Sequence, residues 1–178
     1  MVIIDNNLKS LMKQYELCDE SLIDDFSLKV KLGNHYFATK KNNESIVYGS
    51  HPKPSEIFEE KTSIKQNLTL APGEQVITCS QHIYKIPEDY FGLVQTKGTL
   101  ARLFVAATCN DGQIEPGFKG YITLELINHS PWTIEIPKGS EIAQLYMLKC
   151  SMKAEKKYSG RYAGLAMEGA TIPVFPES

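Results

Sequence analysis

A short segment with a cation at each end has the composition of an anion-binding turn. Residues 97–102, Lys-Gly-Thr-Leu-Ala-Arg, follow a strand-like stretch and lead into helix-compatible residues. A Gly-Thr pair at such a junction exposes backbone N–H groups, and Lys97 and Arg102 flank it with positive charge. We therefore interpret this segment as a candidate phosphate site, and the alternative is a plain turn with solvated charges.

A second segment joins a turn to a strand that carries a carboxylate. Glu115 precedes a Pro-Gly turn, and residues 121–126 then alternate between polar and apolar side chains. The apolar side chains would face a core, whereas Tyr121, Thr123 and Glu125 share the opposite face. A carboxylate flanked by leucines on a central strand could have a raised pKa and act as a general base. The alternatives are a solvated face for Glu125 and an exposed turn position for Glu115.

Two further segments lie closer to the C-terminal end. Residues 139–145 form a turn that leads into a strand, in which a structural hydrogen bond best explains Gln144. Residues 158–162, Tyr-Ser-Gly-Arg-Tyr, place two aromatic rings and one cation in a glycine-rich tail. Such a tail could close over a base and a phosphate, and the alternative is a disordered terminus.

The elements that must position these groups are mostly strands. One substantial helix is predicted over residues 6–17, with Asn6 as its N-cap. Residues 26–32 alternate, with Phe26 on the apolar face, which predicts a strand closed by the Gly-Asn pair that follows. Residues 39–63 are polar and rich in turn formers, so we expect a long excursion and no domain boundary there.

From residue 68 onward, short strands recur at regular spacing and are separated by Pro-Gly, Lys-Gly and Asn. This rhythm predicts an all-β barrel or a jelly-roll-like sandwich. The rhythm is lost from residue 151, so we expect residues 151–178 to form a mobile tail that could fold over a site. A length of 178 residues with 42% hydrophobic content fits one domain with a sizeable core.

The composition excludes several classes of protein. Lys and Arg total 19 against 21 Asp and Glu, so the overall basicity typical of nucleic-acid binding is missing. No membrane span or secretory signal is visible. Four scattered cysteines without a CxxC pair indicate reduced thiols in a cytoplasmic protein: Cys18, Cys79, Cys109 and Cys150. The four histidines show no ligand pattern, so we expect no metal site built from protein side chains: His35, His51, His82 and His129.

Together, the four chemical segments resemble the dCTP deaminase family, within the dCTP deaminase/dUTPase superfamily. The similarity lies in KGTLARL (97–103), IEPGFKG (114–120), ITLEL (122–126), GSEIAQL (139–145) and SGRYAGL (159–165). FSLKVKLG (26–33) and LAPGEQVITCSQHIYKIP (70–87) extend it upstream, so the set covers most of the chain in the family's order. The dUTPases share the fold and resemble IEPGFKG and GSEIAQL particularly well.

The resemblance implies a mostly-β, dUTPase-like β-barrel or double-sheet β-clip fold with a short N-terminal helix. It also implies a homotrimer that binds a deoxynucleoside triphosphate between subunits. In that family pattern, Glu125 matches the general base that takes a proton from the water attacking C4 of cytosine, and Arg102 matches an arginine near the base. Lys97, Gly98 and Thr99 match the phosphate-binding turn, with Mg²⁺ bridging phosphate oxygens and no zinc required.

The resemblance assigns further residues to the substrate. Glu115 matches an aspartate that binds the 3′-hydroxyl of the deoxyribose, and Arg161 replaces a phosphate-binding lysine. The remaining members of the implied substrate-binding set are Leu100, Ala101, Thr123, Leu124 and Tyr158.

Three departures from the family pattern bear on activity. Gly98 stands where the family has a serine that helps hold the attacking water, Leu165 replaces a phosphate-binding glutamine, and Glu115 is one methylene longer than aspartate. The leading interpretation is zinc-independent hydrolysis of dCTP to dUTP and ammonia. The alternatives are dUTP pyrophosphatase activity, alone or combined with deamination, and a non-catalytic nucleotide-binding regulator on the same fold.

Overall fold

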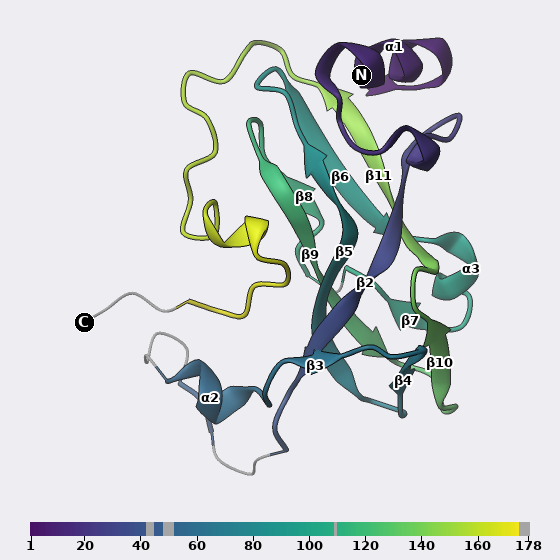
Figure 1. Cartoon of the computed structure of the whole chain (residues 1–178), viewed down its shortest axis with the longest axis vertical. Helices are drawn as coiled ribbons and strands as arrows, with labels where there is room; N and C mark the ends of the chain where they lie inside the picture. Colours follow the sequence, from purple (N-terminus) through teal and green to yellow (C-terminus); the bar gives the residue numbers. More distant parts are fainter. Residues whose placement is uncertain (42–44, 48–51, 109, 175–178) are drawn as a thin grey trace.

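The structure is a computed structural model, and it describes residues 1–41, 45–47, 52–108 and 110–174. A curled antiparallel sheet forms the body of the molecule, with a small two-stranded sheet at one end and helix α1 at the other (Figure 1). The residues after 150 run along one side of the sheet. The predicted mostly-β architecture with a short N-terminal helix is therefore confirmed.

The larger sheet contains β1 (Val2–Ile3), β2 (Leu28–Ala38), β3 (Thr62–Ser63), β5 (Gln75–Lys85), β6 (Tyr90–Thr96), β7 (Val105–Ala106), β8 (Gln113–Ile114), β9 (Lys119–Asn128) and β11 (Glu141–Lys149). The smaller sheet pairs β4 (Asn67–Leu70) with β10 (Ile134–Pro137). The α-helices are α1 (Asp5–Tyr15), α2 (Pro54–Ile57) and α3 (Gly98–Ala101), and single 3-10 turns cover Glu20–Leu22 and Leu165–Met167.

The order of strands in the larger sheet is β7-β9-β5-β2-β11-β6-β8, with β1 beside β11 and β3 beside β2. The pairing of β5 shifts register on both of its sides, against β2 after Leu32 and against β9 after Cys79. Such bulges bend a strand and increase its twist, which curls the sheet around its core. Gly33 lies at this bend, where a Cβ atom would come within 2.6 Å of the Cys79 carbonyl oxygen.

The core fills the inside of the curl. The predicted alternation along β9 is confirmed, because the apolar side chains are buried and the intervening ones are partly exposed: Ile122, Leu124 and Leu126 against Tyr121, Thr123 and Glu125. Tyr84 is fully buried, and its hydroxyl donates to the Lys29 carbonyl at 2.5 Å. This bond satisfies the one polar atom that the ring brings into the core.

Helix α1 contributes the face that its periodicity predicts, since Leu8, Leu11 and Met12 are buried. Its predicted N-cap is wrong, however, because the helix begins at Asp5 and Ile4 takes the capping position. The Asp5 N–H donates to the carbonyl of Asp25 at 2.6 Å. A tertiary backbone contact thus satisfies a helix-end donor that a polar cap would otherwise satisfy.

The strand predicted over 26–32 is shifted toward the C-terminus. Phe26 is 59% exposed and lies in a turn closed by the bond from the Asp24 N–H to the Ser27 carbonyl. The strand begins at Leu28 and passes through the expected Gly-Asn stop to Ala38. Pairing with β5 and β3 stabilises this extension, so the tertiary partners override the local turn signal.

The excursion over 39–63 contains more structure than predicted. Helix α2 and strand β3 lie within it, and Thr39 bridges to Phe58. Residues 42–44 and 48–51, which include His51, lie outside the described part of the chain, as does Cys109. Among the described cysteines, Cys18, Cys79 and Cys150 are free thiols. In the same described part, helices fall short of the length and apolar character needed to span a membrane.

Candidate active site

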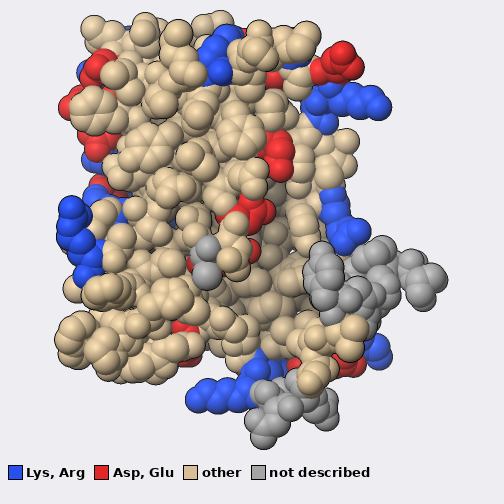
Figure 2. All heavy atoms as spheres, turned by 180° about the vertical axis from the view of Figure 1, so that it is seen from behind, with Lys and Arg blue, Asp and Glu red and all other residues tan. Residues whose placement is uncertain are grey.

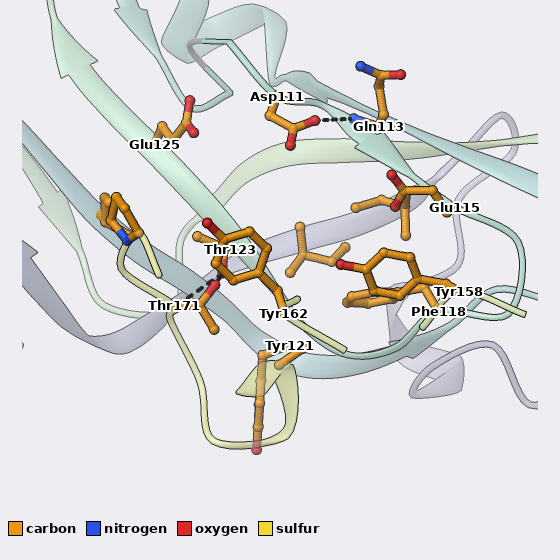
Figure 3. Close-up of a pocket in the computed structure, with 15 residues that line it drawn as sticks. Asp111, Gln113, Glu115, Phe118, Tyr121, Thr123, Glu125, Tyr158, Tyr162 and Thr171 are labelled. Carbon is orange, nitrogen blue, oxygen red and sulfur yellow. Dashed lines mark hydrogen bonds between the residues drawn. The ribbon is translucent and has the colours of Figure 1, made fainter. Parts of the chain in front are cut away.

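A pocket of about 380 Å³ opens beside β9 and brings together three parts of the chain. The outward face of β9, the segment just before it and the C-terminal tail all line it (Figure 3). The lining residues used below are Asp111, Gln113, Glu115, Phe118, Tyr121, Thr123, Glu125, Tyr158, Tyr162, Thr171 and Pro173. Four of the predicted site residues therefore share one cavity: Glu115, Thr123, Glu125 and Tyr158.

Glu125 is half-buried on β9, and a backbone N–H group orients its carboxylate. The Asn110 N–H donates to Oε2 at 3.1 Å. On its other side, Glu125 also borders a smaller pocket of about 180 Å³ that Thr39 and Phe58 help to line. The excursion over 39–63 thus reaches the surroundings of this carboxylate, a point that the sequence analysis left open.

The pocket is acidic. Asp111, Glu115 and Glu125 face it, and among the described residues that line it there is no lysine or arginine. Asp111 accepts from the Gln113 N–H at 3.3 Å, which holds it at the rim. In Figure 2 the charged groups in the middle of the face are acidic, whereas the margins carry both basic and acidic groups. A triphosphate in this pocket therefore needs cations from outside it.

The C-terminal tail packs against the pocket in this structure. The rings of Tyr158 and Phe118 lie 6.1 Å apart, and burial together with the nearby charge of Glu115 raises the pKa of the Tyr158 phenol. Further along, Thr171 and Thr123 hydroxyls lie 2.9 Å apart, and the Thr171 N–H donates to the Thr123 hydroxyl at 3.2 Å. The tail is thus placed to cover a ligand lying on β9.

The candidate phosphate turn lies elsewhere on the chain. Lys97 forms an ion pair with Glu141, and this contact lowers the pKa of the Glu141 carboxyl. Arg102 is exposed and donates to the carbonyl of Gly98, four residues earlier, at 2.9 Å. The Lys97–Arg102 segment does not line the pocket of Glu125, so one chain alone does not bring Arg102 to that carboxylate.

The other residues of this turn differ in how exposed their side chains are. Thr99 and Ala101 are exposed, whereas Leu100 packs partly against the core. Lys97, Thr99 and Leu100 line a separate shallow hollow beside β10 and β11. The turn therefore presents its polar atoms on a surface of the molecule different from the acidic pocket.

Two residues predicted to contact the substrate, Leu124 and Arg161, do not point a free side chain into the pocket. Leu124 is completely buried with its side chain in the core, so that side chain does not reach the pocket. Arg161 is exposed and donates to the carbonyl of Val174 at 2.7 Å, which closes the tail on itself. A phosphate would have to compete with that carbonyl for the guanidinium.

Comparison with known proteins adds the family. The family model described as dCTP deaminase-like matches residues 2–150. The chain belongs to the dCTP deaminase-like family. The predicted family is therefore confirmed, and with it the prediction of an enzyme of the deaminase or hydrolase kind.

Relatives of this dCTP deaminase-like chain match it over most of its length. A "dCTP deaminase, dUMP-forming" of Mycobacterium tuberculosis is 29% identical over 182 residues, which covers 97% of this chain and 93% of the relative. The protein of that name from Mycobacterium marinum is 31% identical over 160 residues, covering 87% and 82%.

A solved structure supports the same fold. The 2′-deoxycytidine 5′-triphosphate deaminase of Agrobacterium tumefaciens superposes with a TM-score of 0.60 at 18% identity. The match covers 82% of this chain but only 47% of that chain. At this identity the likeness concerns the fold alone, and the predicted dUTPase-like architecture is confirmed.

Several residues of this deaminase-like pocket escaped the sequence analysis. Tyr121 was placed on the outer face of β9 by alternation but was not assigned to the substrate. Thr171 and Pro173 carry no motif, and only the path of the tail brings them to β9. Among the described residues, no group of three or more His, Cys, Asp or Glu is placed to hold a metal ion. The roles of magnesium and zinc stay predictions.

Proposed function

We propose that the chain deaminates dCTP and also removes pyrophosphate, so that dUMP, ammonia and pyrophosphate are the products. The observation that carries this proposal is the presence of two carboxylates, Glu125 and Glu115, in one pocket. Two waters are consumed, one at C4 of the base and one at the α-phosphorus. The relatives named as dUMP-forming support this combined reaction over dUTP as the final product.

Glu125 would act as the general base of deamination. It would take a proton from the water that attacks C4 and pass it to the leaving amino group, which departs as ammonia. The Asn110 N–H occupies Oε2 and leaves Oε1 for the water. Thr123 lies on the same face of β9, two residues away, where the base would rest.

Glu115 would serve the phosphate end of the nucleotide. Its carboxylate would activate a second water for attack on the α-phosphorus, with pyrophosphate as the leaving group. In the deamination-only alternative, the same group would instead bind the 3′-hydroxyl of the sugar. Mg²⁺ would arrive with the triphosphate and neutralise it, since carboxylate oxygens such as those of Asp111 and Glu115 suit this ion.

The proposed homotrimer follows the family resemblance, and the charge of the pocket supports sites shared between copies. Three carboxylates face the cavity, while Lys97 and Arg102 lie on another surface of the same chain. A second copy could bring that surface to the pocket and supply the cations that a triphosphate requires. In such a site Arg102 would stabilise charge near the base, and the Gly98–Thr99 N–H groups would bind phosphate.

The glycine at 98 is compatible with activity if its neighbour replaces the missing hydroxyl. Thr99 is exposed and adjacent, so its hydroxyl is available to hold the attacking water in an assembled site. If it does not, the protein would bind nucleotide without turnover, which is the non-catalytic alternative.

Two product assays test these proposals. The purified protein is incubated separately with dCTP and with dUTP in the presence of Mg²⁺, and ammonia and pyrophosphate are measured. We expect both products from dCTP, loss of ammonia by at least about 100-fold in Glu125→Gln, and loss of pyrophosphate in Glu115→Gln. Ammonia without pyrophosphate would limit the enzyme to dUTP formation. Neither product, with dCTP binding retained in calorimetry, would leave only the non-catalytic regulator.

A further inference from the structure

The turn between β5 and β6 makes the first contacts with the chain after it leaves β11. The Cys150 N–H donates to the carbonyl of Asp89 at 3.0 Å, and the Ala154 N–H donates to the carbonyl of Glu88 at 2.8 Å. Residues 150–158 have no helix or strand of their own, so such contacts define their path. In Figure 1 this stretch runs outside the sheet toward the yellow C-terminal segment.

The Glu88 carboxylate binds two lysines of this stretch at once. Lys153 Nζ lies 2.7 Å from Oε2, and Lys157 Nζ lies 2.9 Å from Oε1. The Glu88 side chain is 22% exposed, whereas the two lysine side chains are 70% and 72% exposed. One carboxylate on the β5–β6 turn therefore contacts two points of an exposed segment, and both lysines lower the pKa of Glu88.

Lys157 and Tyr158 connect the anchored segment to the pocket. Lys157 packs on Gly117, where a Cβ atom on the glycine would come within 3.1 Å of the lysine Cβ. Immediately afterwards, the Tyr158 N–H donates to the carbonyl of Pro116 at 3.0 Å, and the Tyr158 ring meets Phe118. The tail thus reaches the turn that carries Glu115 within one residue of its second ion pair.

We propose that Glu88 is a positioning residue that aligns the tail with the active site. By binding Lys153 and Lys157 together, it fixes the segment that delivers Tyr158 to the Glu115 end of the pocket. The ion pairs offset the entropy cost of ordering this segment before the nucleotide binds. Nucleotide binding therefore does not have to offset that cost. The inference rests on the proposed function, since it assigns to Glu88 a part in substrate binding.

Asp89 provides a matched control. It neighbours Glu88 in the same turn and also forms an ion pair with a lysine, but that lysine, Lys149, belongs to β11. Glu88→Gln and Asp89→Asn each remove one carboxylate charge of this turn, but only Glu88→Gln removes the ion pairs with Lys153 and Lys157.

The first measurement follows the tail without any substrate. Hydrogen exchange at the Ala154 and Tyr158 amides, and tryptic cleavage at Lys153 and Lys157, report its anchoring. We expect both to speed up in Glu88→Gln and to stay unchanged in Asp89→Asn. A variant with Glu88→Lys, Lys153→Glu and Lys157→Glu exchanges the charges and should restore slow hydrogen exchange at the two amides. Exchange is its only readout, because the variant lacks both trypsin sites. Because this measurement needs no turnover, it remains decisive even if dCTP proves not to be a substrate.

The second measurement separates binding from chemistry. We expect Glu88→Gln to raise KM for dCTP about fivefold, with kcat within about twofold of the parent. Added salt should raise the parent's KM toward that of Glu88→Gln, because screening weakens exposed ion pairs. Unchanged exchange and KM in Glu88→Gln would overturn the proposal, as would equal effects of the two variants. A lower KM would also overturn it, because it would mean that freed lysines bind phosphate themselves.

Discussion

The alternation of inward and outward side chains along a strand, which repeats every two residues, determines the position of Glu125. Alternation along β9 puts Thr123 and Glu125 on the outer face, and the buried leucines on the other face hold the strand in place. One backbone N–H, that of Asn110, then orients the carboxylate. At this scale, each functional side chain depends on few contacts, so single substitutions give interpretable results.

His35 offers a prediction at the same scale. It is buried, with its Nδ1–H donating to the Asn34 side chain at 2.9 Å and its Nε2 accepting from the Ala170 N–H at 3.3 Å. This arrangement requires the neutral ring. Burial, and then the charge of Lys61, lower the pKa of His35 below its ordinary value of 6.5.

Protonation of His35 should therefore cost stability. The unfolded chain takes up this proton at higher pH than the folded one, so the free energy of unfolding should fall as pH drops below about 6.5. Lys61, Lys138 and Glu168 are the charged residues that line the cavity around the ring. Comparing urea unfolding of the parent and His35→Gln from pH 8 to pH 5 checks this. Parallel pH profiles for the two proteins would contradict it.

At the scale of elements, the bulged stretch of β5 decides the shape of the sheet. It bends where β2 and β9 both change register, and the backbone of β2 approaches β5 closely at Gly33. The bend turns the outer face of β9 toward the tail, which is how Thr171 comes to bond Thr123. The shape of the pocket thus depends on the bulge in β5.

Gly33→Ala tests this close approach. The added methyl would meet the Cys79 carbonyl oxygen at 2.6 Å, and the neighbouring backbone has little room to move. We expect a loss of about 1–3 kcal/mol in the free energy of unfolding. Gly164→Ala is the control, because open space surrounds that position, and it should change stability by less than about 0.5 kcal/mol. Equal stabilities of the two variants in urea would show that β2 relaxes around the methyl.

At the scale of the whole molecule, the distribution of charge separates two halves of a site. The pocket holds carboxylates, and the Lys97–Arg102 turn presents cations on another surface. Large exposed side chains lie close to that turn, with Leu103 44% and Phe104 63% exposed. A second copy covering this region would bury apolar surface and bring opposite charges together.

Mixed assemblies test the shared site. Glu125→Gln and Arg102→Ala should each be inactive, but their co-expressed mixture should regain ammonia release from dCTP. About a quarter of the sites in a random mixture would receive Glu125 from one variant and Arg102 from the other. Mixing the two variants after separate purification, without subunit exchange, is the control. A mixture as inactive as its components would place both residues of a site in one chain.

Much of the fold and part of the site could be predicted from the sequence. The strand rhythm, the alternation at 121–126 and the ordered motifs identified the mostly-β fold and the family, because periodicity and motif order are local properties of the chain. Glu125 and Glu115 were predicted as site residues from the same patterns, and their roles stay predictions. The N-cap at Asn6 and the strand over 26–32 failed because tertiary partners replaced the local signals there.

Only the tertiary structure decided which predicted residues share a cavity. It joined Glu125 to Glu115, brought Thr171 and Tyr158 to them, and left Arg102 on a separate surface. It also paired Glu88 with two lysines more than sixty residues away in sequence. Such contacts depend on how the sheet curls and where the tail runs, and these follow from the packing of the whole chain.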